Sequence, residues 1–158
     1  MSSSTDIRHR LAMDGNLFMV GRRSVGQPAG SENDFLIKTG AKALLLSLEV
    51  APEPGANFLV EFYEAPTITA DGAATALCNM NRVSDRTLLT TCFSAPTVTA
   101  PGNLLFNCVG TVDLGSGGTH HNGLWVLAPN TKYLLRMTNT GGAAADCGYS
   151  LQMHELSL

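Results

Sequence analysis

The adjacent residues His120 and His121, in a glycine-rich stretch of this 158-residue chain, are the first candidates for metal or acid–base chemistry. A zinc site needs further ligands at suitable spacing. No H-x-x-E-H, H-E-x-x-H or H-x-H pattern accompanies the pair. We therefore expect these histidines to be solvated or packed at a symmetry axis, and we expect no metal and no cofactor.

Nucleophilic and general acid–base catalysis have equally weak candidates. Ser116, in the sequence LGSGG, lacks the G-x-S-x-G pattern and the strand, sharp turn and helix that surround a catalytic serine. His154 and Glu155 are neighbours on an expected strand, where successive side chains point to opposite faces. Scattered carboxylates could form a glycosidase-like pair only through the tertiary fold. The sequence predicts no catalytic residues and a protein that is not an enzyme.

The single tryptophan and the four cysteines are expected to be structural. Trp125 could stack on a sugar, but a buried tryptophan is common in β-sandwich cores, so we expect it in the core. The cysteines are widely spaced and form no C-x-x-C pair, which favours free, buried thiols on strands over a disulfide or a zinc site. These cysteines are Cys78, Cys92, Cys108 and Cys147.

Charge argues against nucleic acid and membrane as partners. Charged residues make up 15% of the chain, against about 25% in an average domain. Residues 35–158 contain six basic and nine acidic groups, whereas phosphate binding needs a basic surface. No run approaches the roughly 18 apolar residues of a membrane span, and the N-terminus lacks the features of a signal peptide. We expect synthesis and retention in the cytoplasm, at least until any assembly.

The first 34 residues differ from the rest of the chain. They contain several glycines and little periodicity, which predicts an extended N-terminal arm (residues 1–34) ahead of one β-sandwich domain (residues 35–158). The alternative is that the apolar residues 17–20 fold back as the first strand of the body. If the arm contacts a partner, the candidate contact residues are Arg8, Arg10, Phe18, Arg22 and Arg23.

An octapeptide occurs twice, thirty residues apart. APTITADG at residues 65–72 returns as APTVTAPG at 95–102, and each copy follows an apolar run. Each proline suits a strand start, an edge or a bulge, and each glycine supplies the positive φ of a tight turn. The repeat predicts a duplicated strand-turn-strand module, with a hairpin turn at Asp71-Gly72 and a type II turn at Pro101-Gly102.

Short β-like runs separated by turn signals fill the chain from residue 35 onward, and no stretch has a convincing helical period over three turns. The pattern predicts an all-β fold, a two-sheet antiparallel β-sandwich with the jelly roll as the favoured arrangement. The main expected strands are residues 35–39, 42–50, 58–63, 88–93, 104–112, 124–127, 131–139 and 149–154.

Five segments together resemble a group of small tailed-bacteriophage structural proteins, which look like capsid decoration (cement) proteins. The resemblance is distributed over roughly residues 35–156 and contains no catalytic motif. The segments are FLIKTG (35–40), FYEAPTIT (62–69), NMNR (79–82), APTVT (95–99) and WVLAPNTKYLLRMTN (125–139).

The resemblance implies a virion protein on the outer surface of an icosahedral head. Such a protein commonly forms a homotrimer and bridges subunits of the major capsid protein. The arm would then extend onto a neighbour, so that deletion of residues 1–30 would leave a folded body that no longer decorates the capsid. The alternative function is a carbohydrate- or receptor-binding jelly-roll module of a tail fibre or tip, which would need exposed aromatic side chains among the ten present.

Overall fold

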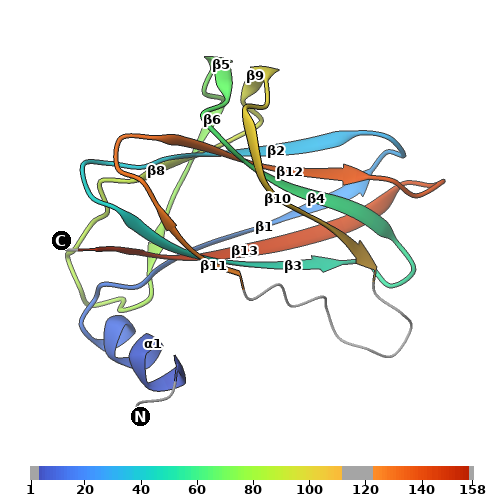
Figure 1. Cartoon of the computed structure of the whole chain (residues 1–158). Helices are drawn as coiled ribbons and strands as arrows, with labels where there is room; N and C mark the ends of the chain where they lie inside the picture. The colour runs from blue at the N-terminus through green and yellow to red at the C-terminus, as the bar shows by residue number, and fades with distance from the viewer. Residues whose placement is uncertain (1–3, 112–122, 157–158) are drawn as a thin grey trace.

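The computed structural model describes residues 4–111 and 123–156, and these residues form two packed antiparallel sheets, a small ribbon and one helix (Figure 1). The helix is α1 (Ser4–Met13). Sheet A has the spatial order β11 (Gly123–Leu127), β3 (Leu44–Pro52), β13 (Ala145–Glu155), β1 (Phe18–Gln27) and β7 (Cys78–Asn79). Sheet B has the order β10 (Asn103–Thr111), β4 (Asn57–Glu64), β12 (Lys132–Asn139), β2 (Glu32–Lys38), β8 (Thr91–Ser94) and β6 (Ala73–Thr75). The ribbon pairs β5 (Thr67–Ala70) with β9 (Thr97–Ala100).

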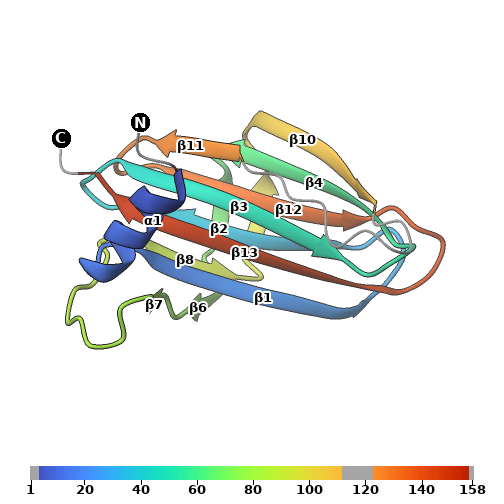
Figure 2. The same ribbon diagram turned by 90° about the horizontal axis from the view of Figure 1, so that it is seen from below.

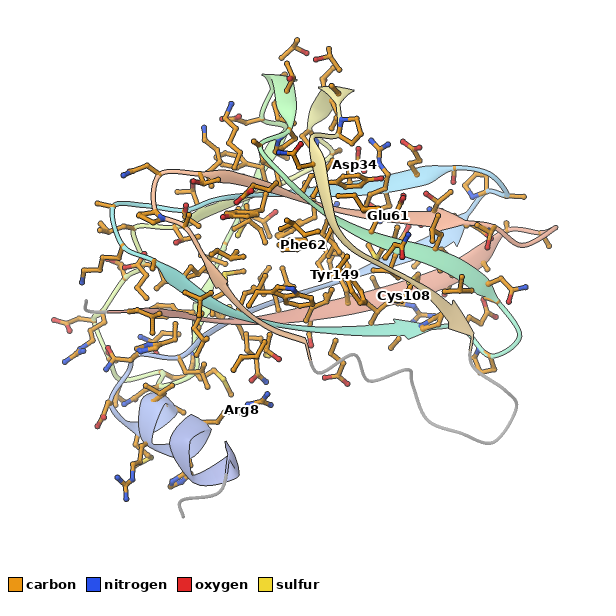
Figure 3. All side chains as sticks on the ribbon, viewed as in Figure 1. Arg8, Asp34, Glu61, Phe62, Cys108 and Tyr149 are labelled. Atoms are coloured by element: carbon orange, nitrogen blue, oxygen red, sulfur yellow. The ribbon has the colours of Figure 1, made fainter. Side chains whose placement is uncertain are left out.

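The predicted two-sheet sandwich is confirmed, and its core follows from strand alternation. In β3, alternate side chains from Leu44 to Val50 are at most 1% exposed, while Glu49 on the other face is exposed. Figure 3 shows Phe62 and Tyr149 pointing into the space between the sheets, where the Tyr149 ring lies 5.3 Å from that of Phe35. The apolar faces of both sheets therefore form one core.

The long strands pair in a nested order, the first with the last. β1 pairs with β13, β2 with β12, β3 with β11, and β4 with β10, all antiparallel. The first and third of these pairs lie in sheet A, and the other two lie in sheet B. A jelly roll requires eight strands in two Greek keys, and this nested order is compatible with it.

The extended N-terminal arm is not confirmed, because most of residues 18–34 belongs to the sandwich. β1 runs antiparallel to β13, with Phe18 opposite Met153. Phe18 and Val20 are each 4% exposed and lie in the core. The rest of the strand lacks apolar alternation because Gly21, Arg22 and Arg23 are exposed. Deletion of residues 1–30 would therefore remove a core strand together with α1.

The helix α1 ends in a Schellman motif and rests on sheet A. The amide of Gly15 donates to the carbonyl of Ala12 (3.0 Å), and the amide of Asn16 donates to the carbonyl of Leu11 (2.8 Å). Gly15 has φ 68°, and a Cβ there would overlap the side chain of Ser84. Figure 2 shows α1 lying across β3 and β13, where Arg8 donates to Ser47 Oγ at 3.5 Å.

Candidate functional site

A two-stranded ribbon stands out from sheet B, above β2 and β12 in Figure 1. Its strands β5 and β9 come from the two copies of the octapeptide. We call this pair the projecting ribbon. The duplicated module is present, but neither copy folds back on itself as a hairpin. Each copy pairs with the other instead: β5 with β9, and β6 with the β8 strand that leads into the second copy.

Equivalent backbone contacts hold the base of the projecting ribbon on sheet B. Ala65 and Ala95 both adopt positive φ, 55° and 52°, a conformation that is uncommon for residues other than glycine. The amide of Ala65 donates to the carbonyl of Lys132 (2.9 Å), and that of Ala95 donates to the carbonyl of Asp34 (3.1 Å). The chain therefore leaves the sheet at two kinks anchored on neighbouring strands.

The glycines of the repeat allow the two copies to pack closely. Gly72 has φ 90°, and a Cβ there would overlap the carbonyl oxygen of Ser94. Gly102, its equivalent thirty residues later, has φ 94°, and a Cβ there would overlap the carbonyl oxygen of Glu64. Each copy thus packs its glycine against the strand end of the other copy, which any larger residue would prevent.

The pairing pattern around the ribbon is two-fold symmetric. β12 pairs with β2 through Leu134 opposite Leu36. Outside this pair, Leu134 is opposite Tyr63 and Leu36 is opposite Phe93, and these two aromatic residues are thirty positions apart. Leu104 is opposite Tyr63, and Ala74 is opposite Phe93, and these two outer residues are also thirty positions apart. The approximate axis therefore passes between Leu36 and Leu134.

The same symmetry continues into the projecting ribbon. The hydroxyl of Thr69 donates to the carbonyl of Thr97 (3.3 Å), and the hydroxyl of Thr99 donates to the carbonyl of Thr67 (3.1 Å). All four threonines are exposed, and neither strand carries a charged residue. The two strands of the projecting ribbon therefore present equivalent, uncharged surfaces of threonine side chains.

Ion pairs flank the base of the ribbon on the outer face of sheet B. Arg136 donates to both carboxylate oxygens of Asp34, each at 2.8 Å, and lies 3.0 Å from Glu32. The hydrogen bond with Asp34 raises the pKa of the Arg136 guanidinium. Lys38, at the symmetry-equivalent position, pairs with Asp71 at 2.8 Å.

The carboxylates on this face have structural partners. The hydroxyl of Tyr63 donates to Glu61 Oε1 at 2.8 Å. Desolvation is the larger cause and this hydrogen bond the second cause that raise the pKa of Tyr63 to about 12. Figure 3 shows Asp34 and Glu61 near the ribbon side of the molecule. Within residues 4–111 and 123–156, no group of three or more His, Cys, Asp or Glu side chains could hold a metal ion.

The arginines and phenylalanine proposed as partner contacts are not gathered at one place. Arg8 and Arg10 are exposed on α1, whereas Arg22 and Arg23 are exposed on β1. Arg23 forms an ion pair with Asp146. Phe18 fills the core and presents no surface to a partner. The predicted partner role of the four arginines stays a prediction, and that of Phe18 is withdrawn.

The candidates for chemistry have structural roles or lie outside the described residues. Trp125 is half-buried between the rings of Phe62 and Phe106, at 5.5 and 5.6 Å, as expected for a residue that packs on the core. His154 Nδ1 lies 2.9 Å from the carbonyl of Asn16. Glu155 instead accepts the amides of Leu89 and Thr90, at 2.7 and 2.9 Å. His120, His121 and Ser116 lie in the part of the chain that is not described.

The four cysteines are free thiols, as predicted, but only two of them are buried. Cys92 and Cys147 lie in the core, and desolvation raises the pKa of each thiol to about 12. Cys108 is half-buried and Cys78 is exposed, so the prediction of burial was wrong for Cys78. Cys78 is exposed because it lies on β7, a two-residue strand at the edge of sheet A.

The sequence showed the repeat but not that its two copies would pair as a projecting ribbon. The absence of charged residues from both duplicated strands was the signal that could have marked them as a candidate site. No protein-family model matches the chain, and no curated protein matches it either. Among the described residues, no helix is long and apolar enough to cross a membrane.

Proposed function

We propose that this chain is a non-enzymatic structural protein of a virion, which decorates the outside of a phage capsid and stabilises it by bridging major capsid protein subunits. The observation that carries the proposal is the projecting ribbon, a neutral protrusion anchored on a rigid sheet. The resemblance to small phage structural proteins supports it, because the two copies of the octapeptide are among the resembling segments.

The ribbon is suited to binding because it is already ordered. Its base is held by the Ala65 and Ala95 amides, and its strands are joined by the Thr69 and Thr99 hydroxyls. A preorganised element loses little conformational entropy on binding. Many copies on one lattice would each shift the equilibrium toward the closed shell, so a modest affinity per copy suffices.

The finer architectural assignments belong to the same proposal. We interpret the sandwich as a jelly roll, which the nested strand order supports. The resemblance implies a homotrimer on the capsid surface.

The first test is co-sedimentation of the purified protein with expanded heads. Thr69→Asp and Thr99→Asp place a charge at equivalent sites of the ribbon, and both are expected to reduce binding at least tenfold. Thr140→Asp is the matched control, because Thr140 is also exposed and its hydroxyl also donates to a backbone carbonyl, that of Asn57 at 3.2 Å. Wild-type binding that the ribbon variants retain would remove the ribbon from the proposal, and absence of wild-type binding would remove the function.

The glycan-binding alternative has less support. It needs an exposed aromatic side chain, and the two ring neighbours of Trp125 already cover much of its surface. Retention on a glycan array that Trp125→Ala abolishes, by a protein that does not bind heads, would favour glycan binding over capsid decoration.

A further inference from the structure

A cavity of about 290 Å³ lies on the side of the sandwich where sheet B ends in β6 and sheet A ends in β7 (Figure 2). The chain crosses from sheet B to sheet A at residues 76–77, between these two strands, and returns to sheet B through residues 80–90. Both crossings contribute to the cavity wall, since Leu77 and Leu88 line it. The cavity therefore lies between the two crossings and the edge of the core.

Buried apolar side chains form much of its lining. Phe18 from β1 and Cys92 from β8 belong to the core. Leu77 and Leu88 are half-buried and pack against the same core. An apolar cavity of about 150 Å³ stays dry and binds benzene. This cavity is about twice as large, so it has room for an apolar group of roughly eight carbons.

Hydrogen bonds hold the wall of the cavity in place. Glu155 Oε1 accepts the amides of Leu89 and Thr90 at 2.7 and 2.9 Å, and the hydroxyl of Thr90 at 3.2 Å. Nearer the start of the same segment, the side-chain amide of Asn79 donates to the carbonyl of Arg86 (3.3 Å). The returning segment is therefore ordered before any ligand binds, which lowers the entropic cost of binding.

Arg86 is the only charged residue in the lining of the cavity, among the residues that the structure describes. Its guanidinium donates to Asn16 Oδ1 through Nη1. A guanidinium carries five N–H donors, so further donors are left for a ligand. Pockets that bind small molecules combine an apolar lining with a few polar groups that fix the orientation of the ligand. Arg86 is suited to that role.

A polar cleft of about 370 Å³ adjoins the cavity, and Arg86 lines both. The cleft carries two positive charges, on Lys42 and Arg86, and one negative charge, on Glu155. One positive charge is therefore in excess when His154, which also lines the cleft, is neutral. The Glu155 carboxylate already accepts three hydrogen bonds from Leu89 and Thr90. The boundary between the cavity and the cleft therefore favours an anionic group.

We propose that this cavity binds a small amphiphilic carboxylate, with its aliphatic chain packed on Leu77 and Leu88 and its carboxylate bound by Arg86. The planar guanidinium can donate two parallel hydrogen bonds to a carboxylate. Burial of the aliphatic chain supplies the larger part of the affinity. The inference does not depend on the proposed function.

Isothermal titration calorimetry of the full chain with three probes tests the chemistry of the ligand. Octanoate should bind one per chain, with a dissociation constant on the order of 100 μM. Hexanoate should bind about fifteenfold more weakly, because each buried methylene contributes about fourfold. 1-Octanol has the same chain without the charge and should bind about tenfold more weakly than octanoate. Absence of octanoate binding, or equal affinity for octanoate and either of the other probes, would overturn the proposal.

Two arginine variants test the carboxylate contact. Arg86→Gln should weaken octanoate binding about tenfold and leave octanol binding unchanged, because only the anion uses the guanidinium. Arg82→Gln is the matched control, because Arg82 is also exposed on the same segment and does not line the cavity. It should bind octanoate as the wild type does. An equal octanoate affinity in the two variants would overturn the assignment to Arg86.

Methyl NMR locates the bound aliphatic chain. Octanoate should shift the methyl resonances of Leu77 and Leu88 and leave those of Val126 unchanged, because Val126 is exposed on β11, at the far edge of sheet A. Unchanged resonances of Leu77 and Leu88 at saturating octanoate would overturn the placement in this cavity.

Discussion

Leu36 of β2 and Leu134 of β12 lie directly opposite each other in sheet B, and neither is exposed to solvent. Their neighbours along the strands, Phe35 and Leu135, belong to the main core, so the two leucines face away from it. They lie where the projecting ribbon joins the sheet, between Tyr63 and Phe93. The two leucines are therefore buried on the outer face of sheet B, apart from the main core.

The symmetry of the repeat predicts equal costs at its two glycines. Gly72→Ala and Gly102→Ala each introduce a Cβ that overlaps a backbone oxygen at positive φ, so each should lower the free energy of unfolding by about 2 kcal/mol. Gly142→Ala is the control, since no atom lies within 4 Å of its Cβ, and it should change stability by less than about 0.5 kcal/mol. Urea denaturation measures all three, and a large difference between the first two would contradict the symmetry.

Two truncations separate α1 from the sandwich. Deletion of residues 1–13 removes a helix that rests on the surface of sheet A, so the shortened protein should remain folded. Deletion of residues 1–30 removes β1, with Phe18 and Val20 from the core, and should prevent cooperative folding. Circular dichroism with thermal melting distinguishes the two, and a folded 31–158 fragment would restore the arm interpretation.

The two ion pairs beside the ribbon should differ in strength. Asp34 and Arg136 have side chains only 12% and 14% exposed, so Asp34→Ala leaves a largely buried charge and should cost about 3 kcal/mol. The side chains of Asp71 and Lys38 are each 35% exposed, and Asp71→Ala should cost less than about 1 kcal/mol. Chemical denaturation of both variants decides the point, and equal costs would argue against it.

Alkaline pH should destabilise the fold through the buried thiols. Burial raises the pKa of Cys92 and Cys147 from 9.0 to about 12, whereas both thiols ionise near pH 9 in the unfolded chain. Unfolding therefore releases protons above pH 9, and the free energy of unfolding should fall by about 2 kcal/mol between pH 9 and pH 10 for the two thiols together. The double variant Cys92→Ala/Cys147→Ala should show a fall that is smaller by about 2 kcal/mol, and the remaining fall comes from Cys108 and the tyrosines, whose pKa values the fold also raises. An unchanged slope would exclude the two buried thiols as a cause.

Strands with clear alternation were predictable from the sequence. The run 42–50 became β3 (Leu44–Pro52), and 131–139 became β12 (Lys132–Asn139), because one face of each strand is buried in the core. β1 (Phe18–Gln27) was underestimated because Gly21, Arg22 and Arg23 interrupt its apolar pattern. α1 has no apolar face to detect, although Asp14-Gly15 after Arg10 in the last turn was a usable helix-end signal.

The pairing of the projecting ribbon could not be predicted from local sequence signals. Asp71-Gly72 is a good hairpin turn, and local propensity alone favours pairing within each copy. The strands before and after each copy, β4 and β6 for the first and β8 and β10 for the second, lie on opposite sides of β12 and β2. Neither copy can therefore fold back on itself, and the two copies pair with each other. Only the order of sheet B reveals this arrangement.

Electron cryomicroscopy of expanded heads mixed with the purified protein tests whether this chain decorates the shell through its ribbon. We expect sandwich-shaped density on the outer surface of the shell, with the projecting ribbon directed at major capsid protein subunits. Bare heads at saturating protein, or bound protein whose ribbon points into solvent, would contradict it.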